Sequence, residues 1–197
     1  HSMHICDLSK HGSSAEVIST ITSQCGIVSG FVHSAGFQIT KPARSMNRQE
    51  YFDLYQTNAV SAFDIVKELS KSKKFDPAGS SVVFISSIMS FLANPGLAGY
   101  CASKAALVAG AKALALELAP KKIRVNCIAP GFIEDTTMMS SLLNQLSEAE
   151  LSNLKQGYPL GLGESNDVAN LCLFLLSDVS RWITGQNIVI DGGYSIK

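Results

Sequence analysis

Short runs of consecutive apolar residues alternate along the chain with longer stretches in which apolar residues recur every three or four positions. The short runs predict buried strands, and the longer stretches predict helices that bury one face. Strands are expected over residues 4–8, 27–32, 81–85, 123–128 and 186–190. Helices are expected between them, over residues 13–24, 47–72, 100–118 and 166–176. Residues 134–160 show no clean period and predict a mobile, partly helical flap.

The apolar runs are continuous rather than alternating, which is typical of strands buried on both faces. A regular succession of such strands and helices predicts a parallel sheet with helices on both sides. The expected fold class is therefore α/β, a doubly wound, Rossmann-like parallel sheet. The 197 residues suit a single domain over residues 4–197, and residues 1–3 are interpreted as an expression scar.

Local signals mark the ends of several predicted helices. Asn47 and Glu50 predict a capping box at the start of the long second helix. Gly26 is expected to end the first helix, and Pro120 the third.

The composition excludes several classes of protein. Charged residues make up 16% of the chain and the formal net charge is zero, so the basic surplus of a nucleic-acid-binding protein is missing. The five cysteines are scattered, which argues against a disulfide framework or a metal site and favours a reduced, cytoplasmic setting. No apolar run approaches the roughly 18 residues of a membrane span, so no membrane segment is expected.

One stretch carries the strongest candidate chemistry. Ser87 follows the predicted strand 81–85, and Tyr100 begins the next helix with Lys104 one turn later on the same face. A neighbouring cation is expected to lower the pKa of Tyr100 from about 10, which makes the phenol a usable general acid or base. Ser87 is expected to reach the same cleft and hold a substrate oxygen. Taken alone, the Tyr100 and Lys104 pair is more often an ordinary pair on a helix surface.

Further candidates also come at the ends of predicted strands, namely Asp7, Ala35, Gly36, Pro130 and Gly131. Ligands of parallel α/β sheets bind beyond the carboxyl ends of the strands, so these residues are expected to converge with Ser87. Asp7 has a second interpretation, as a cap for the helix that begins near residue 13. His33 is interpreted as a packed residue at a strand end, because no second metal ligand or acid–base partner is spaced to help it.

With Ser87, Tyr100-Cys101-Ala102-Ser103-Lys104 and Pro130-Gly131 in register, the chain resembles the short-chain dehydrogenase/reductase family over nearly its whole length. The resemblance implies a catalytic tetrad in which Asn58 acts through a bound water: Asn58, Ser87, Tyr100 and Lys104. It implies contacts with the cofactor's adenine ring at Asp7 and Leu8. The remaining cofactor contacts that it implies are Ala35, Gly36, Tyr100, Lys104, Pro130, Gly131, Ile133 and Thr136.

The chain departs from the family pattern in three places. His33 and Ser34 stand where the family has two asparagines. Asp135 replaces a threonine, for which Thr136 is expected to substitute. The family's opening strand, Gly-rich turn and helix have no counterpart before His4, so the native protein is expected to be longer. Without that βαβ portion, the strand 4–8 would have no neighbour.

The resemblance implies an NAD(P)-dependent dehydrogenase or reductase that transfers hydride between nicotinamide and a carbonyl or alcohol. The phrases at residues 129–134 and 183–186 are similar to 3-oxoacyl-acyl-carrier-protein reductases, which implies that substrate and NADP, with NAD as the alternative cofactor. An apolar substrate pocket is expected from Phe37, Ile39, Met89, Phe91, Met138 and Met139, with surface-loop packing as the competing interpretation.

The family also pairs its helices into dimers and tetramers, so a cytoplasmic homodimer or homotetramer is expected. The competing hypothesis is a non-catalytic cofactor-sensing or assembly protein that retains the fold. The missing Gly-rich segment and the altered turn at His33 favour it, whereas the intact tetrad argues against it. A third hypothesis is a fragment that cannot bind the cofactor.

Overall fold

The computed structural model describes residues 1–10, 12–71, 74–139 and 147–196. Four parallel strands form one sheet, and their spatial order follows their order in the chain. They are β1 (Gly30–His33), β2 (Ser80–Ile85), β3 (Ile123–Pro130) and β4 (Asn187–Ile190). Because all four run the same way, their carboxyl ends meet along one edge of the sheet.

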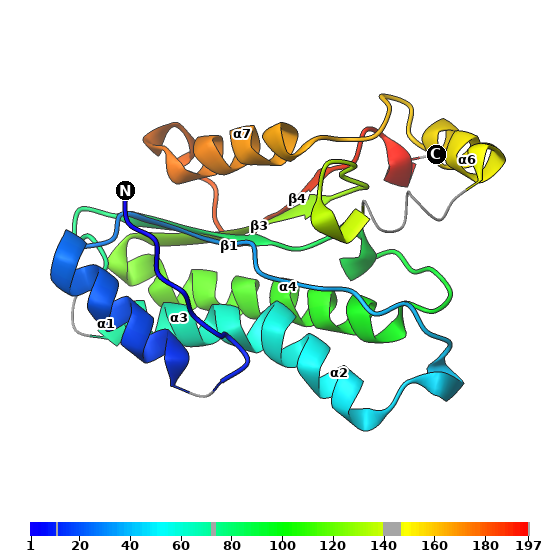
Figure 1. The fold of residues 1–197 in the computed structure, drawn as a ribbon. Helices are drawn as coiled ribbons and strands as arrows, with labels where there is room; N and C mark the ends of the chain where they lie inside the picture. The colour runs from blue at the N-terminus through cyan, green and yellow to red at the C-terminus, as the bar shows by residue number, and fades with distance from the viewer. Residues whose placement is uncertain (11, 72–73, 140–146, 197) are drawn as a thin grey trace.

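Helices cover both faces of this sheet (Figure 1). One face carries α1 (Ser13–Cys25), α2 (Arg48–Tyr55), α3 (Ser61–Ser70) and α4 (Ala98–Leu118). The other face carries α7 (Ser165–Leu176), and α6 (Glu148–Gln156) lies near the C-terminus. This arrangement confirms the predicted doubly wound, Rossmann-like class. In the described part of the chain, no helix combines the length and apolar character needed to cross a bilayer.

The two central strands explain why their sequences are apolar throughout. Side chains of β2 and β3 point alternately to the two faces and are buried on both. Phe84 and Val125 pack in the cluster that includes Leu107 of α4. Val83 and Ile128 pack in the cluster on the opposite face, around Leu175 of α7.

The long second helix forms, but it is interrupted. Its predicted capping box is confirmed, since the Asn47 side chain accepts from Glu50 N and Glu50 accepts from Asn47 N. A π turn over Gln56–Val60 then separates α2 from α3. The helix ends at Ser70 rather than at residue 72, which lies outside the described residues.

The strand predicted over residues 4–8 is wrong. None of the strands in the described sheet pairs with this segment, and a strand without a neighbour leaves its backbone groups without ladder partners. A turn forms instead, in which Asp7 O accepts from Lys10 N at 3.1 Å and from Ser13 Oγ at 2.7 Å. This turn leads into α1, which ends at Gly26 as predicted.

The segment expected to form a flap is helical in part, over α6. Residues 140–146 of it lie outside the described residues. The residues on either side of this segment pair with each other, since Ile133 forms an isolated parallel bridge with Gly163.

Candidate active site

Tyr100 and Lys104 lie one turn apart on the face of α4 that packs against the sheet, as their spacing predicts. Both are almost completely buried, with 6% and 4% of their surfaces exposed. Lys104 Nζ donates to the carbonyl oxygen of Ile85, the last residue of β2, at 2.9 Å. The ammonium is therefore fixed at the carboxyl edge of the sheet.

Ser87 follows β2 and so lies at the same carboxyl edge of the sheet. Its Oγ accepts from Met89 N at 3.1 Å and so caps the short 3-10 turn Ile88–Ser90. The Ser87 side chain also interacts with the Tyr100 hydroxyl in the sense that lowers the pKa of the phenol. Strand end, turn and helix thus bring a serine, a phenol and a cation together.

The effect of this environment on Tyr100 differs from the expectation. Burial raises the pKa of Tyr100 above its usual value, and the interaction with Ser87 opposes the rise without cancelling it. Lys104 Nζ lies over the ring, 5.8 Å from its centre, instead of beside the hydroxyl. The predicted lowering of the Tyr100 pKa by Lys104 is therefore wrong for this arrangement, and the phenol is protonated at neutral pH.

Burial also affects the cation. It lowers the pKa of Lys104 to about 8, because the charged form loses its hydration. The buried thiol of Cys127, on β3, has its pKa raised to about 12 for the same reason. Lys104 therefore remains mostly charged at neutral pH and Cys127 stays neutral.

Asn58 lies inside the π turn and is completely buried. Its Oδ1 accepts from Phe37 N at 2.9 Å, and its Nδ2 donates to Phe37 O at 3.0 Å. The same Nδ2 donates to Ser103 Oγ at 2.9 Å. The side chain therefore joins the segment after β1 to the residue directly before Lys104.

Gly36 permits the close approach of this segment to the cluster. A Cβ atom at Gly36 would lie 3.1 Å from Asn58 Oδ1 and 3.2 Å from Lys104 Nζ. Any larger residue would therefore push against the polar groups of the site. The absence of a side chain at Gly36 thus lets the segment after β1 lie directly against Asn58 and Lys104.

The turn after β3 lies at the same edge. A Cβ atom at Gly131 would lie 2.9 Å from a ring carbon of Tyr158, so the turn and the Tyr158 ring are in close contact. A cavity of about 250 Å³ lies beside this turn, with Gly131, Ile133 and Asp191 among its lining residues. Thr136 Oγ1 donates to Ile133 O at 3.1 Å.

The structure explains the aspartate that replaces the family's threonine. Asp135 Oδ1 accepts from Ser165 N at 2.9 Å and from Ser165 Oγ at 2.8 Å. Asp135 thereby satisfies a backbone donor at the start of α7, where a negative charge is favourable.

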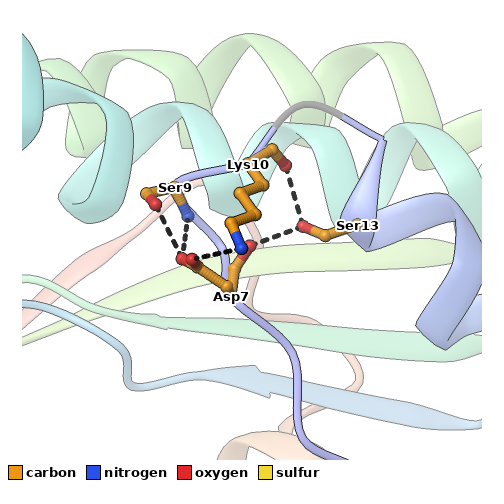
Figure 2. Close-up of polar contacts among 4 residues, drawn as sticks. All are labelled: Asp7, Ser9, Lys10 and Ser13. Carbon is orange, nitrogen blue, oxygen red and sulfur yellow. Dashed lines mark hydrogen bonds and ion pairs between the residues drawn. The ribbon is translucent and has the colours of Figure 1, made fainter.

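Asp7 and Leu8 belong to a different environment. Asp7 Oδ1 accepts from the backbone and hydroxyl of Ser9, and its other oxygen lies 3.6 Å from Lys10 Nζ (Figure 2). Leu8 packs against the core cluster beneath the sheet. The recorded contacts of these two residues do not include the tetrad.

Two residues near the site were missed by the sequence reasoning. Ser103 Oγ donates to Tyr100 O at 2.8 Å while accepting from Asn58; its place in Tyr100-Cys101-Ala102-Ser103-Lys104 was the available signal. Tyr158 stacks on Tyr194, with ring centres 4.6 Å apart and planes at 25°. No local pattern signals that stack, because its partners lie 36 positions apart in the chain.

Of the predicted substrate contacts, Phe37, Ile39 and Met89 lie in one apolar cluster with Tyr100. Phe91 is half exposed. The apolar wall next to the phenol is therefore made by the segment after β1 and the turn after β2.

Comparison with known proteins places this geometry in a family. A family model described as Enoyl-(Acyl carrier protein) reductase matches residues 1–195. The 3-oxoacyl-(acyl-carrier-protein) reductase FabG of Staphylococcus epidermidis is 35% identical over 179 residues, which are 90% of this chain and 71% of the relative.

Solved structures agree with this match. A short-chain type dehydrogenase/reductase from Mycobacterium marinum has a TM-score of 0.89 at 29% identity, over 98% of this chain and 74% of that chain. A 4-hydroxyisoleucine dehydrogenase mutant complexed with NADH and succinate has a TM-score of 0.88 at 28% identity, over 97% and 78%. The chain therefore belongs to the short-chain dehydrogenase/reductase family of NAD(P)-dependent oxidoreductases.

Proposed function

We propose that the protein reduces the ketone of a 3-oxoacyl thioester, carried by an acyl carrier protein, with NADPH. The observation that carries the proposal is the buried contact of a strand-end serine, Ser87, with a protonated phenol, Tyr100, beside the Lys104 cation. The similarity to the FabG reductase of Staphylococcus epidermidis supports the substrate.

Ser87 and Tyr100 have complementary roles in this proposal. The nicotinamide, when bound, supplies the hydride. Ser87 donates a hydrogen bond to the carbonyl oxygen and stabilises the negative charge that develops there. Tyr100 gives its hydroxyl proton to the same oxygen. Because burial raises the pKa of Tyr100, the phenol is protonated and ready in the reducing direction.

Lys104 binds the cofactor in this proposal, and Asn58 takes part in restoring the proton of Tyr100. An ammonium has three N–H donors, so the bond from Lys104 to Ile85 O leaves donors for the hydroxyls of the nicotinamide ribose. Asn58 orders the water from which the proton of Tyr100 is restored.

The remaining cofactor contacts divide into two groups. Ala35, Gly36, Pro130 and Gly131 approach the ribose and nicotinamide, together with Ile133 and Thr136. Asp7 and Leu8 approach the adenine ring. NADP follows from the likeness to acyl-carrier-protein reductases, and a solved relative complexed with NADH keeps NAD as the alternative.

The proposal also includes the oligomeric state and location: the protein forms a homodimer or homotetramer in the cytoplasm. The outward face of α4 carries small exposed residues, Ala105, Ala109 and Ala113. On α2, the rings of Phe52 and Tyr55 are 55% and 46% exposed. Large exposed rings beside a small-residue face favour close packing of these helices against a second copy. Sedimentation velocity of the native protein tests this, and a monomer at working concentration contradicts it.

The decisive experiment replaces Tyr100 by phenylalanine in the native protein. Tyr100→Phe is expected to reduce kcat by about 10²–10⁴-fold on an acetoacetyl thioester, because the general acid is lost. NADPH binding, measured by fluorescence, is expected to persist. Tyr51→Phe, the same change at an exposed ring of α2 outside the proposed contact between copies, serves as the control and should keep its activity. Equal turnover of Tyr100→Phe and the unaltered protein would rule out the proposed role of Tyr100.

A further inference from the structure

His33 is the last residue of β1. It is a buried histidine that has no role in the chemistry proposed above. Only 3% of its surface is exposed. Its ring lies edge-on to Phe31 and Phe84, with ring centres 6.4 Å and 6.3 Å apart. Its Nε2 lies 2.8 Å from Ser61 Oγ, at the start of α3. The histidine therefore links the end of a strand to the long helix through one specific polar contact.

The hydrogen bonds of Ser61 determine which ring nitrogen of His33 carries the proton. Ser61 Oγ donates its single hydrogen to Thr57 O at 2.7 Å. Towards His33 it must therefore accept, so His33 Nε2 is the donor and the ring is the Nε2–H tautomer. His33 Nδ1 has no partner among the described residues. Burial and the charge of Lys104 lower the pKa of His33 to about 4, so the ring stays neutral at physiological pH.

Ser61 in turn supports the irregular part of the helix. In a regular α-helix, Ser61 N would donate to Thr57 O. Here the π turn redirects Ser61 N to Gln56 O. The hydroxyl of the same serine then donates to Thr57 O in place of its backbone. His33 thus contacts the residue whose side chain repairs the altered hydrogen bonding of the π turn.

Asn58 is the next residue after Thr57, and its position depends on the same turn. The end of β1 and the segment after it therefore make two contacts with this region: the His33 side chain contacts Ser61, directly after the π turn, and the Phe37 backbone contacts Asn58 within it. The two contacts come from the first and last residues of the five-residue segment 33–37. Asn58 completes the connection by donating to Ser103, next to Lys104.

We propose that His33 is a positioning residue of the active site: by donating to Ser61 it fixes the π turn and thereby the orientation of the Asn58 amide. This rests on the proposed function, in which Asn58 orders the water that restores the proton of Tyr100. The proposal requires that residue 33 supply a buried, neutral N–H donor at the position of Nε2. It does not require a residue that titrates as an acid or a base.

The test uses His33→Gln and His33→Leu in the native protein. Glutamine keeps an N–H donor near the Nε2 position, whereas leucine removes it and remains apolar. We expect His33→Leu to lower kcat by about tenfold or more through misplacement of Asn58, with the KM for NADPH unchanged, and His33→Gln to restore most of kcat. Hydrogen exchange of the Phe37 amide, measured by NMR, is expected to accelerate in His33→Leu and to recover in His33→Gln.

Two serine variants separate positioning from simple loss of stability. Ser61→Ala is expected to reproduce the His33→Leu effects, and the double variant to be no worse than either single one. Ser81→Ala removes a buried serine that donates to Leu175 O at 2.7 Å, on the α7 side of the sheet. It should lower stability without changing Phe37 exchange or kcat.

The outcomes are distinct. If His33→Leu lowers stability as Ser81→Ala does but leaves Phe37 exchange and kcat unchanged, His33 only fills space and the proposal is overturned. If His33→Leu does not fold, Ser61→Ala decides the same question. If the unaltered protein reduces no carbonyl substrate while Phe37 exchange still follows the His33 donor, the proposed function fails and the structural assignment stands.

Discussion

The carboxyl edge of the sheet and the N-terminal turn at Asp7, which the family resemblance assigns to the same cofactor, are stabilised by different kinds of contact. At the carboxyl edge of the sheet, Asn58 is completely buried and bonds to Phe37 and Ser103, residues 21 and 45 positions away in the chain. In the N-terminal turn, Asp7 is exposed and, within the part of the chain that the structure describes, bonds only to residues within six positions of itself (Figure 2). The first region is held by tertiary packing, and the second by a local turn.

This difference has energetic consequences. A buried polar group left without its partner loses a hydrogen bond that water cannot replace, whereas an exposed one exchanges its partner for water. Substitutions at the carboxyl edge should therefore affect stability and chemistry together. Substitutions at Asp7 should separate the two properties.

The largest effect is expected from Asn58→Leu, which preserves the approximate volume and removes the amide. The backbone groups of Phe37 and the hydroxyl of Ser103 lose their buried partner, so the free energy of unfolding should fall by about 3 kcal/mol. Denaturant unfolding measures this value. Asn153→Leu, the same change on the exposed surface of α6, is the control and should remain within about 0.5 kcal/mol. A loss as small as the control's would show that the network does not stabilise the fold.

A somewhat smaller effect is expected from acid. The pKa of His33 is about 4 in the folded protein and 6.5 when unperturbed, so the unfolded chain binds the proton first as the pH falls. Its contribution to stability is complete above pH 6.5 and disappears as the pH falls towards 4. Between pH 7 and pH 5 this amounts to about 2 kcal/mol. Lys104 does not contribute in this range, because its pKa of about 8 keeps it charged in both states.

His33→Gln carries no titrating group and should remove that part of the pH dependence. The measurement is denaturant unfolding of both proteins at pH 7 and pH 5. If the two proteins lose stability equally on acidification, then His33 is not held neutral by its surroundings.

These contrasts also explain what the sequence could predict. The periodicity of residues 100–118 placed α4 within two residues of its observed start, and Tyr100 and Lys104 on one buried face. The apolar runs located β2 and β3 because those strands are buried on both sides. In each case one local pattern reports directly on burial.

The failures concern properties that depend on distant partners. The apolar residues of 4–8 suit a strand, but a strand needs a neighbour that the local pattern does not reveal. The π turn leaves the apolar period almost unchanged while it redirects the Ser61 amide to Gln56. The pKa of Tyr100 follows from its burial, which helical spacing alone does not determine. The tetrad and cofactor residues stay predictions until the proposed variants are measured.

Asp135 combines features of the two regions: its contact joins residues far apart in the chain, as at the carboxyl edge, but it is exposed, as in the N-terminal turn. Its carboxylate receives both donors of Ser165, 30 positions later in the chain. Asp135→Ala should therefore cost about 1 kcal/mol of stability, the value of a helix-terminus cap. Asp135→Asn keeps an acceptor oxygen and should recover most of it. A change near 3 kcal/mol would mean that sequence separation matters more than burial.

The smallest effect on stability is expected at Asp7. Its bonds to Ser9, Lys10 and Ser13 lie at the surface, so Asp7→Ala should leave the unfolding midpoint unchanged. The proposed adenine contact makes a separate prediction for binding: loss of one hydrogen bond should raise the Kd for NADPH about fivefold. Titration of the native protein with NADPH measures it, with Asp53→Ala on α2 as the matched exposed carboxylate. If the Kd is the same for both variants, Asp7 only closes the turn before α1, and the cofactor contacts that remain proposed are those at the carboxyl edge of the sheet and at Leu8.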